Sequence, residues 1–238
     1  MIKKLFGRTI ILLGGLLLAT SGSVVSAQTP APGYNSSWKN NDGSSKLALQ
    51  FGGGYSLAVG GTRQSQTRGW NYIMGSGYNF NNHFSVLGRY TYNHFSVPQG
   101  QIAQLFGPGE LGQLAGDVHL WSLTVEPSYQ YFNTAHYGGY VLVGGGFYRK
   151  RTLFRQTPGC PDNVCGPPTN NVADFSNNAG GIDFGVGFNR RISERSNTKL
   201  FFEARYVWVD NQASPNNTYY PPANERTSFL PVSGGVRW

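Results

Sequence analysis

Long runs in which apolar and polar residues alternate are the feature that most constrains the fold of this chain. In the final run, Leu230, Val232 and the last residue, Trp238, share one parity. Ser233 and Arg237 share the other parity. Successive side chains of a strand point to opposite faces, so this run predicts a strand with one apolar face.

Seven more runs of this kind precede the final one. The eight predicted strands are 46–59, 67–80, 83–95, 117–132, 137–150, 176–192, 198–210 and 225–238. Strands of soluble proteins are usually about 5–6 residues long, and each run here is more than twice that length. A tilted strand needs about 9–11 residues to cross a membrane, so the lengths favour a transmembrane sheet over a soluble sandwich.

The chemistry of the two faces supports the same interpretation. Aromatic residues stand near the ends of the apolar parity, where membrane interfaces favour them, at Tyr92, Trp121, Tyr131, Trp208 and Trp238. The opposite parity carries mainly Gly, Ser and Asn with isolated charges, as a packed polar interior would. The mean hydropathy of −0.33 is compatible with strands that are apolar only at every second residue. Lipid cannot form hydrogen bonds with the backbone groups of an open sheet edge, so the first and last strands must pair.

The sequence therefore predicts an all-β fold, an eight-stranded antiparallel up-and-down transmembrane β-barrel. Lys3, Lys4 and Arg8 precede the apolar stretch Ile10–Ala19, the pattern of an export signal. An uncleaved anchor would need about 20 apolar residues, and this stretch is shorter. The predicted organisation is a cleaved signal peptide at 1–27, a flexible periplasmic lead-in at 28–45 and the barrel at 46–238. Residues 137–150 are nearly all apolar or Gly, and their faces cannot be assigned from the pattern.

With these strands and the closing residues Gly234–Trp238, the chain resembles the outer-membrane protein A-like family, the small outer-membrane β-barrels of Gram-negative bacteria. The resemblance covers about 46–238. It implies a monomer in the bacterial outer membrane, with the N-terminus and short turns in the periplasm. It also implies that Val236 and Trp238 form the signal read by the barrel-assembly machinery, with periplasmic chaperones as partners during biogenesis.

Several charged residues fall on the parity predicted to face the barrel interior. They are Arg89, Glu126, Asp183, Arg191, Glu203, Arg205 and Arg237. Charges in a narrow lumen must pair or stay hydrated, which predicts either a salt-bridged interior or an ion pathway. Eight strands leave room for little more than their own side chains, which favours the salt-bridged interior. Glu203 and Arg205 lie two residues apart, within reach of Arg237 on the neighbouring strand.

An enzyme is a further hypothesis, because some eight-stranded barrels hydrolyse lipid acyl chains. His94 and Ser96 share a strand face and resemble the base and nucleophile of such hydrolases. Asp117 or Glu110 would orient the histidine. The remaining histidines are scattered without zinc-site spacing, and no cofactor is predicted.

The two cysteines, Cys160 and Cys165, predict a small loop disulfide, because an exported chain meets an oxidising compartment. Metal binding is disfavoured because no histidine or third cysteine lies near them. The net charge of +8 belongs partly to the signal peptide, and no basic helix or nucleic-acid motif is present.

The connections 96–116 and 151–175 are longer than strand closure requires, so they are predicted to form the working surface. A basic cluster at one mouth either contacts lipopolysaccharide phosphates or forms a solvated rim; its members are Arg149, Lys150, Arg151 and Arg155. The predicted role is structural or surface-interacting, with outer-membrane lipid and lipopolysaccharide as partners. The alternatives are a narrow channel for small solutes and a lipid-modifying hydrolase.

Overall fold

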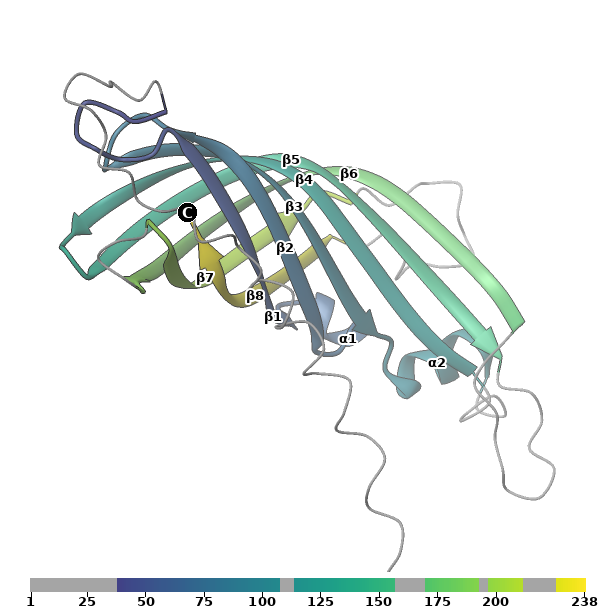
Figure 1. Ribbon diagram of the computed structural model, residues 1–238. Coiled ribbons are helices and arrows are strands. Elements are labelled where there is room, and N and C mark those ends of the chain that lie inside the picture. Colours follow the sequence, from purple (N-terminus) through teal and green to yellow (C-terminus); the bar gives the residue numbers. More distant parts are fainter. Residues whose placement is uncertain (1–37, 108–113, 157–169, 193–196, 212–225) are drawn as a thin grey trace, which may run out of the picture. The chain divides into compact units, whose positions relative to one another are not determined.

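The computed structural model describes residues 38–107, 114–156, 170–192, 197–211 and 226–238, and the statements below concern these residues. Figure 1 shows the strands and the short helices with their labels. They are β1 (Leu47–Ala58), α1 (Thr62–Ser65), β2 (Gly69–Asn79), β3 (Phe84–Ser96), α2 (Gln99–Phe106), β4 (Leu114–Asn133), β5 (Tyr137–Gln156), β6 (Asn170–Arg191), β7 (Lys199–Val209) and β8 (Thr227–Arg237).

The strands form one closed antiparallel barrel in which each strand pairs with its neighbours in sequence. Closure is made by β1 and β8, whose register places Phe51 opposite Val236 and Tyr55 opposite Val232. The eight-stranded up-and-down barrel predicted from the alternating runs is confirmed. None of the helices in the described ranges has the length and apolarity of a membrane-spanning helix.

The predicted faces of the strands are also confirmed. On β3, Leu87, Arg89 and Thr91 are buried inside the barrel. On β8, the parity that carries Arg237 points inward, whereas Trp238 is 42% exposed. The inward parity is thus the mixed polar one, and the exposed parity is the apolar one, which is the reverse of a water-soluble barrel.

The faces of β5, which the pattern leaves open, are decided by its pairing with β4 and β6. Tyr140 and Tyr148 point inward and are almost completely buried. Each is accommodated by a glycine on β6: a Cβ on Gly187 would collide with the ring of Tyr140, and one on Gly181 would lie 2.7 Å from Cε2 of Tyr148. The glycines of β6 therefore make room for two interior rings.

The central strands extend farther than the sequence predicts. β4 begins at Leu114, β5 continues to Gln156 and β6 begins at Asn170, so the connections expected at 96–116 and 151–175 are partly strand. The strand pairing continues because inward apolar side chains such as Phe154 and Leu114 remain available for packing. Part of the first connection is instead the helix α2, which is followed by Gly107 with a φ of 100° that suits glycine.

An apolar cluster fills the barrel interior at the end where the helices lie, which we call the loop end (Figure 1). Its buried members are Phe95, Val97, Ile102, Leu114, Val118, Leu120, Tyr148, Phe154, Val207, Val209 and Phe229. Ile102 is completely buried and anchors α2 in this cluster. The opposite end, where short turns join the strands, is called the short-turn end.

Residues 38–45, part of the predicted lead-in, pack against the short-turn end. Lys39 and Ser45 form an isolated β-bridge. Asn40 Nδ2 donates to the carbonyl of Asn79 at 2.8 Å, and the Asn82 N–H donates to Asp42 at 2.7 Å. These bonds tie the segment to the β2–β3 turn.

Candidate functional site

Five charged side chains from four strands meet in the middle of the barrel and form what we call the interior network. They are Arg89 on β3, Glu126 on β4, Asp183 on β6, and Glu203 and Arg205 on β7. None is more than 3% exposed. Strand alternation supplies the inward direction, and the register of neighbouring strands brings the groups to one level.

Arg89 joins two of the carboxylates. Its Nε lies 2.7 Å from Oε2 of Glu126, as an ion pair whose angles are not those of a hydrogen bond. Its Nη1 donates to Oε1 of Glu203, and its Nη2 donates to Oε1 of Gln50 at 3.2 Å. The guanidinium therefore spans the lumen from β3 to β7.

Arg205 joins the same two carboxylates from the other side and adds a third. Its Nη1 lies 2.9 Å from Oε1 of Glu126 and 3.6 Å from Oδ2 of Asp183. Its Nε lies 3.2 Å from Oε1 of Glu203. Two arginines thus serve three carboxylates, and every charge in the network has an opposite partner, as buried charges require.

Two tyrosine hydroxyls complete the network from β5. Tyr140 donates to Oε2 of Glu203 at 2.8 Å, and Tyr148 donates to Oδ2 of Asp183 at 3.1 Å. Sequence reasoning missed both tyrosines, because β5 has apolar residues or glycine on both parities. Their signal lies only in the pairing of β5 with its neighbours.

Arg191 and Arg237 were expected inside with the other charges, but they do not join the interior network. Both lie at the short-turn end, where Lys199, which sequence reasoning missed, stands between them in the register of β6, β7 and β8. Among the described residues Arg237 forms no ion pair with Glu203, which stands opposite Ser233, four residues up the strand. Arg237 instead donates to Oγ of Ser85 at 2.9 Å and lies over the Tyr140 ring.

His94 and Ser96 lie on the outer face of β3 near the loop end. His94 Nε2 is 3.4 Å from Oδ1 of Asp117, and its ring stacks on Trp70 with centroids 5.6 Å apart. Within the described residues, no hydrogen bond joins the His94 ring to Ser96. Glu110 lies outside the described residues, and the hydrolase hypothesis stays a prediction.

The predicted basic cluster is divided between the two sides of the barrel wall. Lys150 points inward, is 4% exposed and donates to Oγ1 of Thr227. The outward members are Arg149, Arg151 and Arg155, because they share the other parity of β5. The prediction of a single basic cluster at one mouth is therefore wrong, because successive residues of a strand point to opposite faces.

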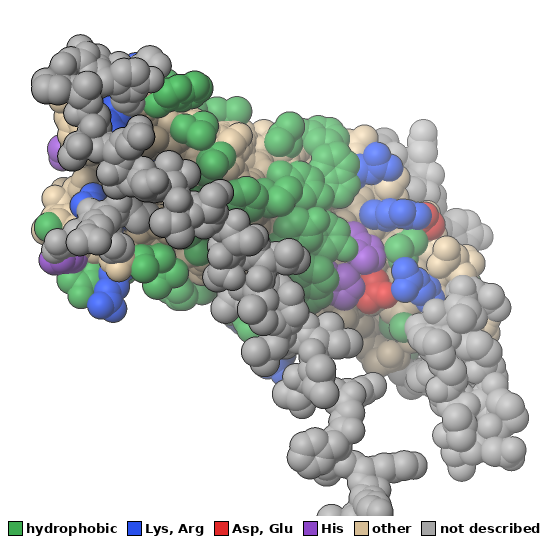
Figure 2. Space-filling model, viewed as in Figure 1, with side chains coloured by type: hydrophobic (Ala, Val, Ile, Leu, Met, Phe, Trp, Pro, Cys, Tyr) green, Lys and Arg blue, Asp and Glu red, His purple; other side chains and the backbone are tan. Residues whose placement is uncertain are grey.

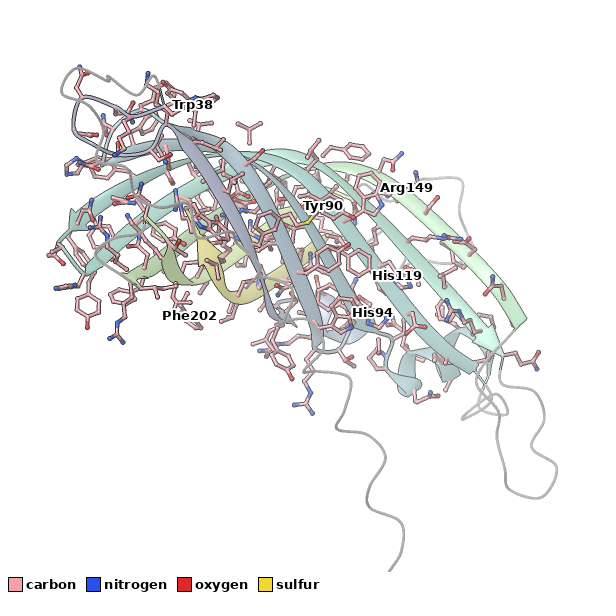
Figure 3. All side chains as sticks on the ribbon, viewed as in Figure 1. Trp38, Tyr90, His94, His119, Arg149 and Phe202 are labelled. Atoms are coloured by element: carbon pink, nitrogen blue, oxygen red, sulfur yellow. The ribbon has the colours of Figure 1, made fainter. Side chains whose placement is uncertain are left out.

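Figure 2 shows basic, acidic and histidine side chains gathered beside the apolar side chains on one face of the barrel, and we call this group the collar. Arg151 forms an exposed ion pair with Asp174 at 2.6 Å, and Arg155 lies 3.9 Å from Asp117. Arg149 has no ion pair among the described residues. Figure 3 shows His94 beside His119, whose ring centroids are 5.0 Å apart.

The remaining predicted residues are placed as follows. Val236 and Trp238 lie on the outer face, and the Trp238 ring packs edge-on against Phe51; their role in assembly stays a prediction. Cys160 and Cys165 lie outside the described residues. The part of the chain that the structure describes has no group of His, Cys, Asp or Glu side chains able to hold a metal ion.

The fold is similar to solved outer-membrane proteins. A major outer membrane protein of Thermus thermophilus matches with a TM-score of 0.52 and 10% identity, over 81% of this chain and 98% of that one. Neisserial surface protein A gives a TM-score of 0.48 and 13% identity, over 81% and 96%. Ail of Yersinia pestis, in complex with the heparin analogue sucrose octasulfate, gives 0.44 and 14%, over 81% and 99%.

No family of known sequences and no curated protein matches the chain. Identities this low show a shared fold alone. The chain has the fold of the small eight-stranded outer-membrane β-barrels.

Proposed function

We propose that the protein is integral to the bacterial outer membrane and has a structural and surface-interacting role, with its loop end binding the phosphates of lipopolysaccharide. The short turns then face the periplasm. Insertion follows the barrel-assembly route, aided by periplasmic chaperones, with the Trp238 strand as its signal. The protein is expected to act as a monomer.

An exposed apolar band supports the membrane location most strongly, and Figure 2 shows it on one face of the barrel. Large apolar side chains more than 40% exposed include Phe51, Met74, Leu123, Val125, Val143, Phe184, Val186 and Phe202. On β4 the band runs from Trp121 to Tyr131, roughly 11 residues, where a tilted spanning strand needs about 9–11. Water-soluble monomers rarely expose apolar patches of more than a few hundred Å².

Arg149 supports the lipopolysaccharide proposal. It is exposed and stands directly opposite Trp121 in the β4–β5 register, at the edge of the apolar band. A lipid phosphate lies at this level when the band is in the hydrocarbon layer. Arg151 already forms an ion pair with Asp174, so Arg149 is the outward arginine best placed to meet a phosphate.

Replacing Arg149 with glutamine is expected to weaken the binding of lipopolysaccharide about threefold to tenfold, because a charge-assisted hydrogen bond to phosphate is lost. The measurement is titration of the protein in neutral maltoside micelles with purified lipopolysaccharide. Arg190→Gln is the matched control, since Arg190 is exposed at the short-turn end. Equal loss in the two variants, or none in Arg149→Gln, would contradict the proposal.

Channel activity is the alternative that a second experiment addresses. The interior network crosses the lumen, and the apolar cluster fills it at the loop end. We therefore expect no conductance steps when the protein is added to planar lipid bilayers. An open porin added to the same bilayers is the positive control, and regular steps with this protein would favour the channel.

A further inference from the structure

Three cations form an unbroken row across the inner face of the barrel at the short-turn end. Arg191 of β6 stands directly opposite Lys199 of β7, and Lys199 stands directly opposite Arg237 of β8. Like charges placed directly opposite on neighbouring strands destabilise a sheet. The row therefore costs stability unless a negative charge neutralises it.

Within the described residues, no carboxylate forms an ion pair with this cation row. Glu203, on the same strand as Lys199, is already held by Arg89, Arg205 and the Tyr140 hydroxyl. Asp42 lines the cavity beside the row, with its oxygens accepting from Ser44 and Asn82. The Ser44 hydroxyl, followed by backbone N–H groups, holds the pKa of the Asp42 carboxyl below its usual range.

Several donors in and beside the cation row are buried without a hydrogen-bond partner. They are Nη1 of Arg237, Nε of Arg191 and Nδ2 of Asn189. Arg237 is only 4% exposed. Burying such donors unsatisfied destabilises a protein, and more so for charged groups, so native proteins usually give them a partner.

A cavity opens onto the row. It has a volume of about 320 Å³, and its lining includes Arg191, Lys199, Asn82 and Asn133 together with the acidic Asp42 and the last residue, Trp238. A narrower cavity shares Lys199 and is lined by Arg237 and Gln130. The volume lies at the lower end of the roughly 300–1,000 Å³ typical of ligand sites, which suits a small ligand.

We propose that the cation row is a binding site for a small phosphate-bearing anion at the short-turn mouth of the barrel. Two guanidinium groups and an ammonium are the kinds of donor that phosphate oxygens accept most readily. A doubly charged oxyanion matches three cations better than a single carboxylate does. The surrounding asparagine amides supply further donors. The anion is either a free phosphate or the headgroup phosphate of a phospholipid.

The test uses the full barrel in neutral maltoside micelles at constant pH and ionic strength. One arm titrates inorganic phosphate and the other titrates dihexanoyl phosphatidylglycerol, both by isothermal titration calorimetry. We expect saturable binding in at least one arm, and the responding arm identifies the source. Acetate is expected to bind at least about tenfold more weakly. Binding in neither arm, or equal binding of acetate, overturns the proposal.

Variants locate the site. Arg191→Gln and Lys199→Gln are each expected to weaken binding about tenfold or more. Arg190→Gln is the matched control, because Arg190 is the preceding residue on β6 and points outward over the Tyr137 ring. Affinity equal to that of the unaltered protein in Arg191→Gln and Lys199→Gln, or an equal loss in Arg190→Gln, overturns the proposal.

A stability readout guards against a folding defect. Without phosphate, Lys199→Gln is expected to raise the urea midpoint of unfolding, because it relieves the repulsion within the row. In the unaltered barrel, saturation with the ligand of the responding arm is expected to raise the midpoint, and in Lys199→Gln it is not. A midpoint that falls in Lys199→Gln without phosphate overturns the proposal.

Discussion

Glu126→Gln is expected to lower the free energy of unfolding by about 3–5 kcal/mol, the usual cost of breaking a buried ion pair from one side. Glu126 is completely buried, and both Arg89 and Arg205 contact it. Glutamine keeps the shape but removes the negative charge, so the two guanidinium groups share fewer carboxylates. The measurement is urea-induced unfolding in phospholipid vesicles, followed by tryptophan fluorescence.

Asp174→Asn is the matched control for this prediction. It removes the charge from an ion pair with Arg151 in which the side chains are 42% and 50% exposed. Exposed pairs contribute about 0–1 kcal/mol, so this variant should unfold almost as the unaltered protein does. Equal, small losses in the two variants would show that the interior network does not hold the strands together.

Val186→Arg is expected to destabilise the barrel by about 2–4 kcal/mol, the cost of an arginine on the lipid face near the bilayer midplane. Val186 is 59% exposed on β6 between Phe184 and Phe188 of the same face. In a water-soluble protein, a charge at so exposed a position would change stability by less than about 0.5 kcal/mol. The same vesicle unfolding assay measures the difference.

Val172→Arg makes the identical substitution on the same strand outside the band. Val172 is 48% exposed near the loop end of β6, past the collar residue Asp174. Because this position lies in water when the band is in lipid, the stability of the barrel should be nearly unchanged in this variant. Similar effects of the two substitutions would remove the evidence that the band faces lipid.

The interior network shows how far sequence reasoning reaches. Alternation alone predicts that Arg89, Glu126 and Asp183 point inward, because a strand has only two faces. It does not predict which inward groups meet, because that depends on register across several strands. Glu203 therefore meets Arg89 from the far wall, whereas Arg237 is displaced toward the short-turn end.

Other features that the sequence did not predict have related causes. Tyr140 of β5 is hidden among glycines and apolar residues on both parities, so only pairing with β6 reveals its face. Lys150 looks like part of a basic cluster in sequence, yet alternation turns it inward, away from Arg149 and Arg151. The helix α2 is too short for a periodic signal, and its burial through Ile102 depends on contacts distant in sequence.

The sequence by itself determined the class of the fold, the number of strands and the face of most residues, since these depend on a period of two and on strand length. Only the tertiary structure decided the levels inside the barrel: an apolar cluster at the loop end, the interior network in the middle, and the row of Arg191, Lys199 and Arg237 at the short-turn end. The physical reason is closure. Joining β1 to β8 fixes the total stagger of the strands around the barrel, and the register of neighbouring strands determines which inward charges meet.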